Sequence, residues 1–121
     1  MLTVQRYVVQ STSGRVLVPF IAEYFSEDET VYTWPCALAM ASYLLAYSNV
    51  VEGKVVLELG SGTGLSSIIS LMLGAQHVIS TDRSAHEFLV GYRLLRYNFE
   101  LNQFPTDQYT VVCTIIYNIN Y

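Results

Sequence analysis

Three apolar runs in the second half of the chain have the length and composition of β-strands. Val55–Leu59 is a continuous apolar run with one acid near its end, which predicts a strand buried on both faces of a parallel sheet. Val78–Thr81 forms a second short strand that ends at Asp82. Thr110–Ile116 is rich in β-branched residues and forms the third. The pattern therefore predicts a sheet of three strands in this part of the chain.

Apolar residues at helical spacing precede and separate these strands. Pro35 suits the first turn of a helix that runs to about Tyr47, and Leu65–Leu73 forms a second helix. The Ser-x-x-Glu pattern of Ser84–Glu87 is a capping box that opens a third. On that helix we expect one buried face, made of Phe88, Tyr92, Leu95 and Phe99. Strands that alternate with helices indicate a parallel α/β sheet with right-handed crossovers.

The first 31 residues have a different pattern. Val4–Gln10 and Val16–Ile21 are β-rich runs on either side of a turn that contains Gly14, which predicts an N-terminal β-hairpin. We expect this hairpin to be an accessory flap. The acidic stretch Glu27–Glu29 is expected to be a solvated loop without chemistry, because no His or Cys joins it at the spacing of a metal site. Residues 1–31 would thus hold the hairpin and acidic loop, and residues 32–121 the α/β unit.

Composition and charge narrow the class of protein. The 121 residues are 52% hydrophobic, enough for one small domain with a core. The net charge is −4 and the basic residues are scattered, so no nucleic-acid partner or anionic membrane is indicated. No secretory signal or membrane-spanning run is present, and Cys36 and Cys113 are expected to be reduced core thiols. These features favour a cytosolic or nuclear protein.

The clearest candidate for a binding site is the segment that follows the first predicted strand. Gly60, Gly62 and Gly64 come directly after that strand and before a helix. Glycines let the backbone turn tightly and approach a ligand closely, and open α/β sheets bind ligands at the carboxyl ends of their strands. A merely tight turn is the alternative. The strand, the helix and a downstream acid favour a ligand site.

That downstream acid is Asp82, which ends the second strand about 20 residues beyond Gly60, where a carboxylate can accept hydrogen bonds from a ribose diol. A turn aspartate is the alternative. The loop satisfies G-x-G-x-G, whereas the dinucleotide pattern G-x-G-x-x-G fails at Leu65. Glu58 would suit a cationic sulfonium and amino group better than a pyrophosphate. The expected cofactor is therefore S-adenosylmethionine, with NAD as a distant alternative.

Four blocks of sequence together resemble a known family. These are Trp34–Ala37, Val56–Leu65, Thr81–Arg83 and Asn98–Asn102, and their order resembles that of the family-16 class I protein methyltransferases. The resemblance implies an α/β Rossmann-like fold and a protein substrate that is methylated on lysine. One branch of the family is associated with histone arginine, so lysine and arginine both remain open as the acceptor.

The resemblance also implies the roles of individual residues. Trp34 would flank the cofactor and Asp82 would hold its ribose, although an isolated tryptophan here would be read as an ordinary buried indole. The cofactor-binding residues are expected to be Trp34, Glu58, Gly60, Ser61, Gly62, Gly64 and Asp82. No catalytic residue is assigned and no metal site is expected. His77 and His86 match no catalytic position and are interpreted as structural or solvated.

The sequence departs from the family after its third strand. The uncharged segment Cys113–Tyr121 does not match, and the later strands with the acceptor-site motifs are missing. We therefore expect a partial Rossmann-like parallel sheet with an N-terminal β-hairpin, the cofactor-binding half of a truncated methyltransferase. The alternative is a non-catalytic fragment or isoform that acts as a cofactor-binding or interaction module. The sequence does not indicate an oligomeric state.

Overall fold

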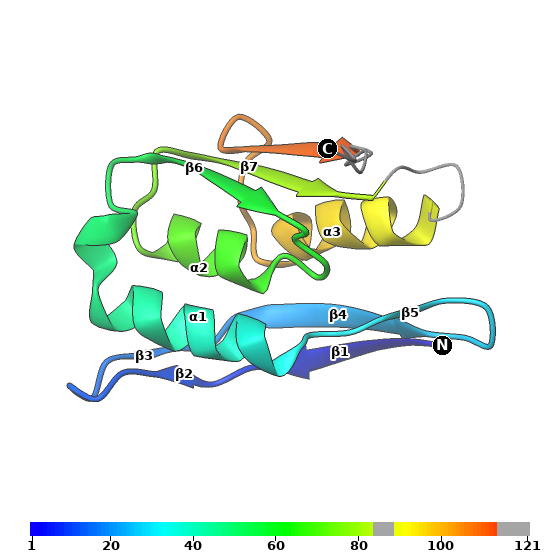
Figure 1. The fold of residues 1–121 in the computed structure, drawn as a ribbon, viewed down its shortest axis with the longest axis horizontal. Helices are drawn as coiled ribbons and strands as arrows, with labels where there is room; N and C mark the ends of the chain where they lie inside the picture. The colour runs from blue at the N-terminus through cyan, green and yellow to red at the C-terminus, as the bar shows by residue number, and fades with distance from the viewer. Residues whose placement is uncertain (84–88, 114–121) are drawn as a thin grey trace, which may run out of the picture.

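The computed structural model describes residues 1–83 and 89–113. In Figure 1 the helices lie between two sheets, a parallel sheet at the top and antiparallel strands at the bottom. The capping box expected at Ser84–Glu87 and the last residues of the third predicted strand, Thr114–Ile116, lie outside the described residues. So do Phe88 and His86. In the part that is described, no helix is both long and apolar enough to cross a membrane.

The parallel sheet has the order β6-β7-β8, as the alternation of strands and helices predicts. β6 is Val55–Leu59, β7 is His77–Asp82 and β8 is Tyr109–Cys113. Two helices make the crossovers, α2 at Leu65–Met72 and α3 at Leu89–Leu101. The predicted α/β class is therefore confirmed. All three strands run in the same direction, so their carboxyl ends meet at one edge, where the candidate site lies.

Helix α1, Pro35–Ala46, precedes the parallel sheet and packs on α2. Pro35 occupies the first turn, where its missing N–H leaves no helical hydrogen bond unmade, so the predicted start is confirmed. A short 3-10 helix, η1 at Ser48–Val50, leads from α1 toward β6. Ala41, Leu44 and Leu45 of α1 are buried in the core. Cys36, in the first turn of the same helix, is exposed, so the expectation that its thiol lies in the core is wrong.

The N-terminal segment forms two small antiparallel sheets, one ordered β1-β4-β5 and one made of β2 and β3. The five strands are β1 (Leu2–Arg6), β2 (Val9–Gln10), β3 (Val16–Leu17), β4 (Phe20–Phe25) and β5 (Thr30–Val31). β2 pairs with β3 around a turn in which Gly14 has a φ of 87°, so the predicted hairpin is confirmed. β1 and β4, which also pair in antiparallel fashion, continue the two arms of this hairpin.

The expectation that this hairpin is an accessory flap is wrong. Ile21 and Ala22 of β4 are fully buried, and Ile21 belongs to the same core cluster as the helices. β4 also packs against α3. The antiparallel sheet therefore covers the helices on the side opposite the parallel sheet, which Figure 1 shows. The alternation of side chains within the hairpin does not reveal this, because it predicts a buried face without saying what that face packs against.

The expectation that β6 is buried on both faces is also wrong. Val55, Leu57 and Leu59 are 60%, 60% and 65% exposed, whereas Val56 on the other face packs against the core. β6 is an edge strand with β7 as its neighbour in the sheet. An apolar run of this kind is expected in a sheet covered on both faces, and in the described part of the chain only the face toward the helices is covered.

Candidate functional site

The candidate site begins with the loop between β6 and α2. Gly60, Gly62 and Gly64 all have positive φ angles, 68°, 53° and 85°. A Cβ atom built on Gly60 or Gly62 would meet nothing within 4 Å, so their backbones border open space. Positive φ favours glycine at these positions, and the lack of side chains leaves the backbone accessible. This part of the loop can therefore approach a ligand closely.

Gly64 has a different structural reason to be glycine. A Cβ atom at this position would lie 2.5 Å from Cδ1 of Leu95 on α3, so a side chain here would force the buried Leu95 to move. Gly64 also precedes α2 in the left-handed conformation. The structure therefore brings Gly64 against a packed helix, while Gly60 and Gly62 line the pocket described below.

The loop is held in place by backbone and carboxylate hydrogen bonds. The N–H of Gly62 donates to Oδ2 of Asp82 at 2.6 Å, and the N–H of Arg83 donates to Oδ1 at 2.6 Å. The N–H of Ser61 donates to the carbonyl of Thr81 at 2.8 Å. The side chain of Ser61 is buried and does not line the pocket described below, and its hydroxyl donates to the carbonyl of Glu58 at 3.4 Å. Asp82 lies at the end of β7 beside the glycines, as the spacing of the two motifs predicts.

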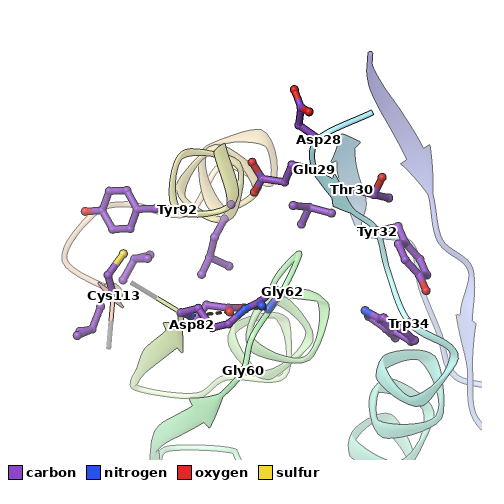
Figure 2. Close-up of a pocket in the computed structure, with 16 residues that line it drawn as sticks. Asp28, Glu29, Thr30, Tyr32, Trp34, Gly60, Gly62, Asp82, Tyr92 and Cys113 are labelled. Carbon is purple, nitrogen blue, oxygen red and sulfur yellow. Dashed lines mark hydrogen bonds between the residues drawn. The ribbon is translucent and has the colours of Figure 1, made fainter. Parts of the chain in front are cut away.

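These residues surround a pocket of about 430 Å³ at the carboxyl ends of the parallel strands. Its walls come from the ends of β6, β7 and β8, from the segment between residue 28 and Trp34, and from the first turns of α3. Figure 2 shows Gly60, Gly62 and Asp82 at one side of the pocket and Trp34 at another. The volume lies within the range of about 300–1,000 Å³ that small-molecule sites occupy.

Trp34 presents its side chain to this pocket. The indole is 59% exposed and stacks on Tyr32, with ring centroids 4.8 Å apart and an angle of 30° between the planes. Its exposure excludes the alternative of a buried indole that packs α1 onto the sheet. An exposed, ordered aromatic face at the wall of a pocket is suited to contact a ligand.

Glu58 contacts Ser61, whose hydroxyl donates to its backbone carbonyl at 3.4 Å, but it does not line the pocket with Gly60, Gly62 and Asp82. Its carboxylate accepts hydrogen bonds from the backbone N–H and the hydroxyl of Ser67, at 3.1 Å and 2.5 Å. It borders a separate groove between β6, α1 and α2. Burial raises the pKa of Glu58, while the hydrogen bonds from Ser67 oppose that shift. Its contacts thus fix the start of α2 relative to β6.

Several pocket residues were missed by the sequence analysis. Asp28 and Glu29 were assigned to a solvated loop without chemistry, yet both line the pocket. The turn between β4 and β5 places them there. In this turn the N–H of Glu29 donates to Oγ of Ser26, and the N–H and the hydroxyl of Ser26 both donate to the carbonyl of Glu29, each at 2.9 Å. Among the described residues, Oε1 of Glu29 is shielded from solvent without a hydrogen-bond partner. No local sequence signal indicates that this turn faces the glycine loop.

Tyr92 is a second correction, because helical spacing placed it in the core with Phe99. Phe99 is fully buried and stacks on Tyr109, with ring centroids 4.2 Å apart, as expected of a core residue. Tyr92 is only half-buried and lines the pocket, and its hydroxyl accepts a hydrogen bond from Nη1 of Arg96 at 3.3 Å. It lies nearly two turns before Phe99, where α3 extends past the sheet toward the pocket.

The charged residues of the pocket are mainly acidic. Asp28, Glu29 and Asp82 line it together with Arg83, which favours a ligand that carries positive charge. Within residues 1–83 and 89–113, no three His, Cys, Asp or Glu side chains gather as a metal-binding group. His77 has the predicted structural role, since its ring nitrogens contact the carbonyl of Asp107 at 3.0 Å and Oγ1 of Thr110 at 2.8 Å.

Comparison with known proteins gives this pocket a family context. Residues 19–116 match the family model described as lysine methyltransferase. The chain belongs to this family. That match covers all four of the sequence blocks that carry the resemblance, from Trp34–Ala37 to Asn98–Asn102.

Individual relatives in the family are similar over part of their length. Mouse histone-arginine methyltransferase METTL23 is 33% identical over 75 residues, which is 62% of this chain and 28% of that protein. Protein N-lysine methyltransferase METTL21A of Xenopus tropicalis is 32% identical over 99 residues, which is 69% of this chain and 46% of that protein. The chain therefore spans less than half the length of these relatives.

A solved structure shows the same fold. SMU.776, crystallised in a complex with S-adenosylhomocysteine (SAH), superposes with a TM-score of 0.65 at 17% identity. The superposition covers 92% of this chain and 26% of that one.

Proposed function

We propose that this chain is the cofactor-binding part of a protein methyltransferase that uses S-adenosylmethionine. The observation that carries the proposal is the glycine loop closed onto Asp82, with Gly60, Gly62 and Trp34 lining the same pocket. Membership of the lysine methyltransferase family and the similarity in fold to a protein solved with SAH support it. When bound, S-adenosylmethionine supplies a methyl group activated by a sulfonium.

Each pocket residue has a defined part in this proposal. One carboxylate oxygen of Asp82 accepts from the N–H of Gly62 and the other from the N–H of Arg83. Each oxygen can accept more than one hydrogen bond, so Asp82 can bind a ribose diol while it keeps its bonds to the loop. The exposed backbone of Gly60 and Gly62 admits the ligand at close range. The exposed face of Trp34 flanks it, and the acidic walls suit its positive charge.

The substrate in this proposal is a protein, with lysine or arginine as the acceptor. The relatives include both a histone-arginine and an N-lysine methyltransferase, so the two acceptors stay open. The chain's part in methyl transfer is to position the cofactor so that a neutral nitrogen can attack its methyl group in line. Cytoplasmic or nuclear residence is part of the proposal, supported by the free thiols of Cys36 and Cys113.

The proposal is tested by equilibrium dialysis of the purified chain with radiolabelled S-adenosylmethionine. We expect saturable binding that unlabelled SAH displaces and that an equal concentration of NAD does not. An Asp82→Asn variant should retain less label, and an Asp107→Asn variant, changed at an exposed aspartate, should behave as the parent chain. Displacement by NAD in preference to SAH would overturn the proposal.

The non-catalytic alternative is separated by a second assay. The chain spans less than half the length of its relatives, so we expect it to bind cofactor without transferring methyl groups to proteins of a cell extract. Label transfer that disappears in the Asp82→Asn variant would show that this chain alone is an active enzyme.

A further inference from the structure

Two asparagines on α3 bind the backbone of β4 in the same way. Oδ1 of Asn98 accepts from the N–H of Ala22 at 2.7 Å, and its Nδ2 donates to the carbonyl of Ala22 at 3.1 Å. One turn later, Oδ1 of Asn102 accepts from the N–H of Phe20 at 2.9 Å, and its Nδ2 donates to the carbonyl of Phe20 at 2.7 Å. β5 pairs with β4 only at Tyr24 and Phe25. β1 pairs with the other edge of β4, so the two amides take the place of a neighbouring strand only along the rest of the edge that β5 begins.

Asn98 differs from Asn102 in its third hydrogen bond. Nδ2 of Asn98 also donates to the carbonyl of Thr63, at 2.9 Å, and Thr63 lies between Gly62 and Gly64 in the glycine loop. Nδ2 of Asn102 instead donates to the carbonyl of Asn98, within its own helix, at 2.7 Å. One side-chain amide thus joins β4, α3 and the loop, while its counterpart joins only β4 and α3.

The environment of Asn98 makes this connection hard to replace. Asn98 is fully buried and both hydrogens of its amide are used, one on each carbonyl. Without them, the carbonyl of Thr63 would have to face protein without a donor, which is unfavourable for a buried polar group. The hydroxyl of Thr63 contacts that of Thr33 at 3.0 Å, so the loop is held from a second direction beside Trp34.

We propose that Asn98 is a positioning residue for the cofactor loop, and that it fixes Thr63 so that the backbones of Gly60 and Gly62 face the pocket. This inference rests on the proposed function, because it assumes that the loop binds a ligand. Asn98 lies behind the loop and acts through Thr63 rather than on the ligand. The N-terminal sheet, through Ala22, is then part of the framework that sets the shape of the pocket.

The matched pair of asparagines supplies the first experiment. Asn98→Ala and Asn102→Ala each remove a bidentate bond to β4, and only the first also releases the loop. By calorimetry at a temperature where circular dichroism shows both variants folded, we expect Asn98→Ala to weaken SAH binding about tenfold. Asn102→Ala should change it by less than about twofold, because its lost bonds do not reach the loop. Equal affinities of the two variants would overturn the inference.

A measurement on the unaltered chain covers the case in which Asn98→Ala does not fold. In heteronuclear NMR spectra, addition of SAH should shift the side-chain amide signals of Asn98 together with the backbone amide of Gly62, and leave those of Asn102 in place. A shift at Gly62 without one at Asn98 would refute the positioning role. A chain in which SAH shifts neither signal would refute the proposed function itself, so the two failures are distinguishable.

Discussion

The N–H of Gly62 donates a hydrogen bond of 2.6 Å to the carboxylate of Asp82. This contact joins the loop after β6 to the end of β7, and it places a backbone that can approach a ligand beside a carboxylate that can accept its hydroxyl groups. The glycine loop and Asp82, which the sequence analysis treats as two parts of one motif, thus form one structural unit in which the carboxylate holds the loop.

Replacement of Asp82 by Ala should weaken SAH binding and loosen the loop. Hydrogen bonds to a charged acceptor contribute about 1.5–3 kcal/mol, which corresponds to roughly a tenfold to hundredfold loss of affinity. The melting temperature should also fall, because the N–H of Gly62 loses its partner. Isothermal calorimetry and thermal melts measure the two effects. Asp107→Ala is the control, and unchanged affinity in Asp82→Ala would refute the role assigned to this carboxylate.

Replacement of Gly62 by Val separates strain from ligand access. Gly62 and Gly14 both have positive φ, 53° and 87°, and a Cβ atom at either would meet nothing within 4 Å. Both Gly62→Val and Gly14→Val should therefore lose about 1–2 kcal/mol of folding free energy from the backbone conformation. Only Gly62→Val should also abolish SAH binding, since its side chain would fill the space that the ligand needs. Similar affinities in the two variants would count against a ligand at the loop.

Glu58 should affect how the folding stability depends on pH, and it should not affect the affinity for the cofactor. Burial raises its pKa in the folded chain above the ordinary value of 4.5, so the folded state holds its proton more tightly than the unfolded state does. The contribution of Glu58 to the free energy of unfolding is therefore fully present below pH 4.5 and is lost as the pH rises through the higher pKa of the folded state. Glu58→Gln should therefore gain stability relative to the parent at pH 7 and lose that advantage at acid pH.

Urea unfolding across this pH range measures the effect, with Glu52→Gln, at an exposed glutamate, as the control. SAH affinity should be nearly unchanged in Glu58→Gln, because the carboxylate points to Ser67 rather than into the pocket. A loss of affinity as large as that of Asp82→Ala would contradict this placement.

The sequence predicted the position of most of the site, and the reasons are local. A glycine loop after one strand and an acid at the end of the neighbouring strand meet at the same edge of a parallel sheet, so Gly62 and Asp82 could be placed together. Glu29 and Tyr92 could not, because their positions depend on how the β4–β5 turn and α3 pack over the loop. The burial of Ile21 and the contacts of Asn98 likewise depend on tertiary packing between distant segments.

The exposed face of β6 predicts association in solution. Val55, Leu57 and Leu59 are each at least 60% exposed on an edge strand, which can pair with another chain. We expect the chain to bind a hydrophobic dye and to self-associate with rising concentration. Leu57→Lys should weaken association, since a charge on an edge strand opposes pairing. Sedimentation measures this, with Val16→Lys on the distant hairpin as the control. A dye-silent monomer at all concentrations would contradict the prediction.

The most direct test of the cofactor site uses the chain's single tryptophan. Trp34 lines the pocket and stacks on Tyr32, so its fluorescence reports on what enters beside the glycine loop. Titration with SAH should produce a saturable change in Trp34 emission whose midpoint equals the calorimetric Kd and moves to higher concentration in Asp82→Ala. NAD at the same concentrations should leave the emission unchanged. Binding of SAH without any response of Trp34, or a response to NAD in its place, would contradict the account.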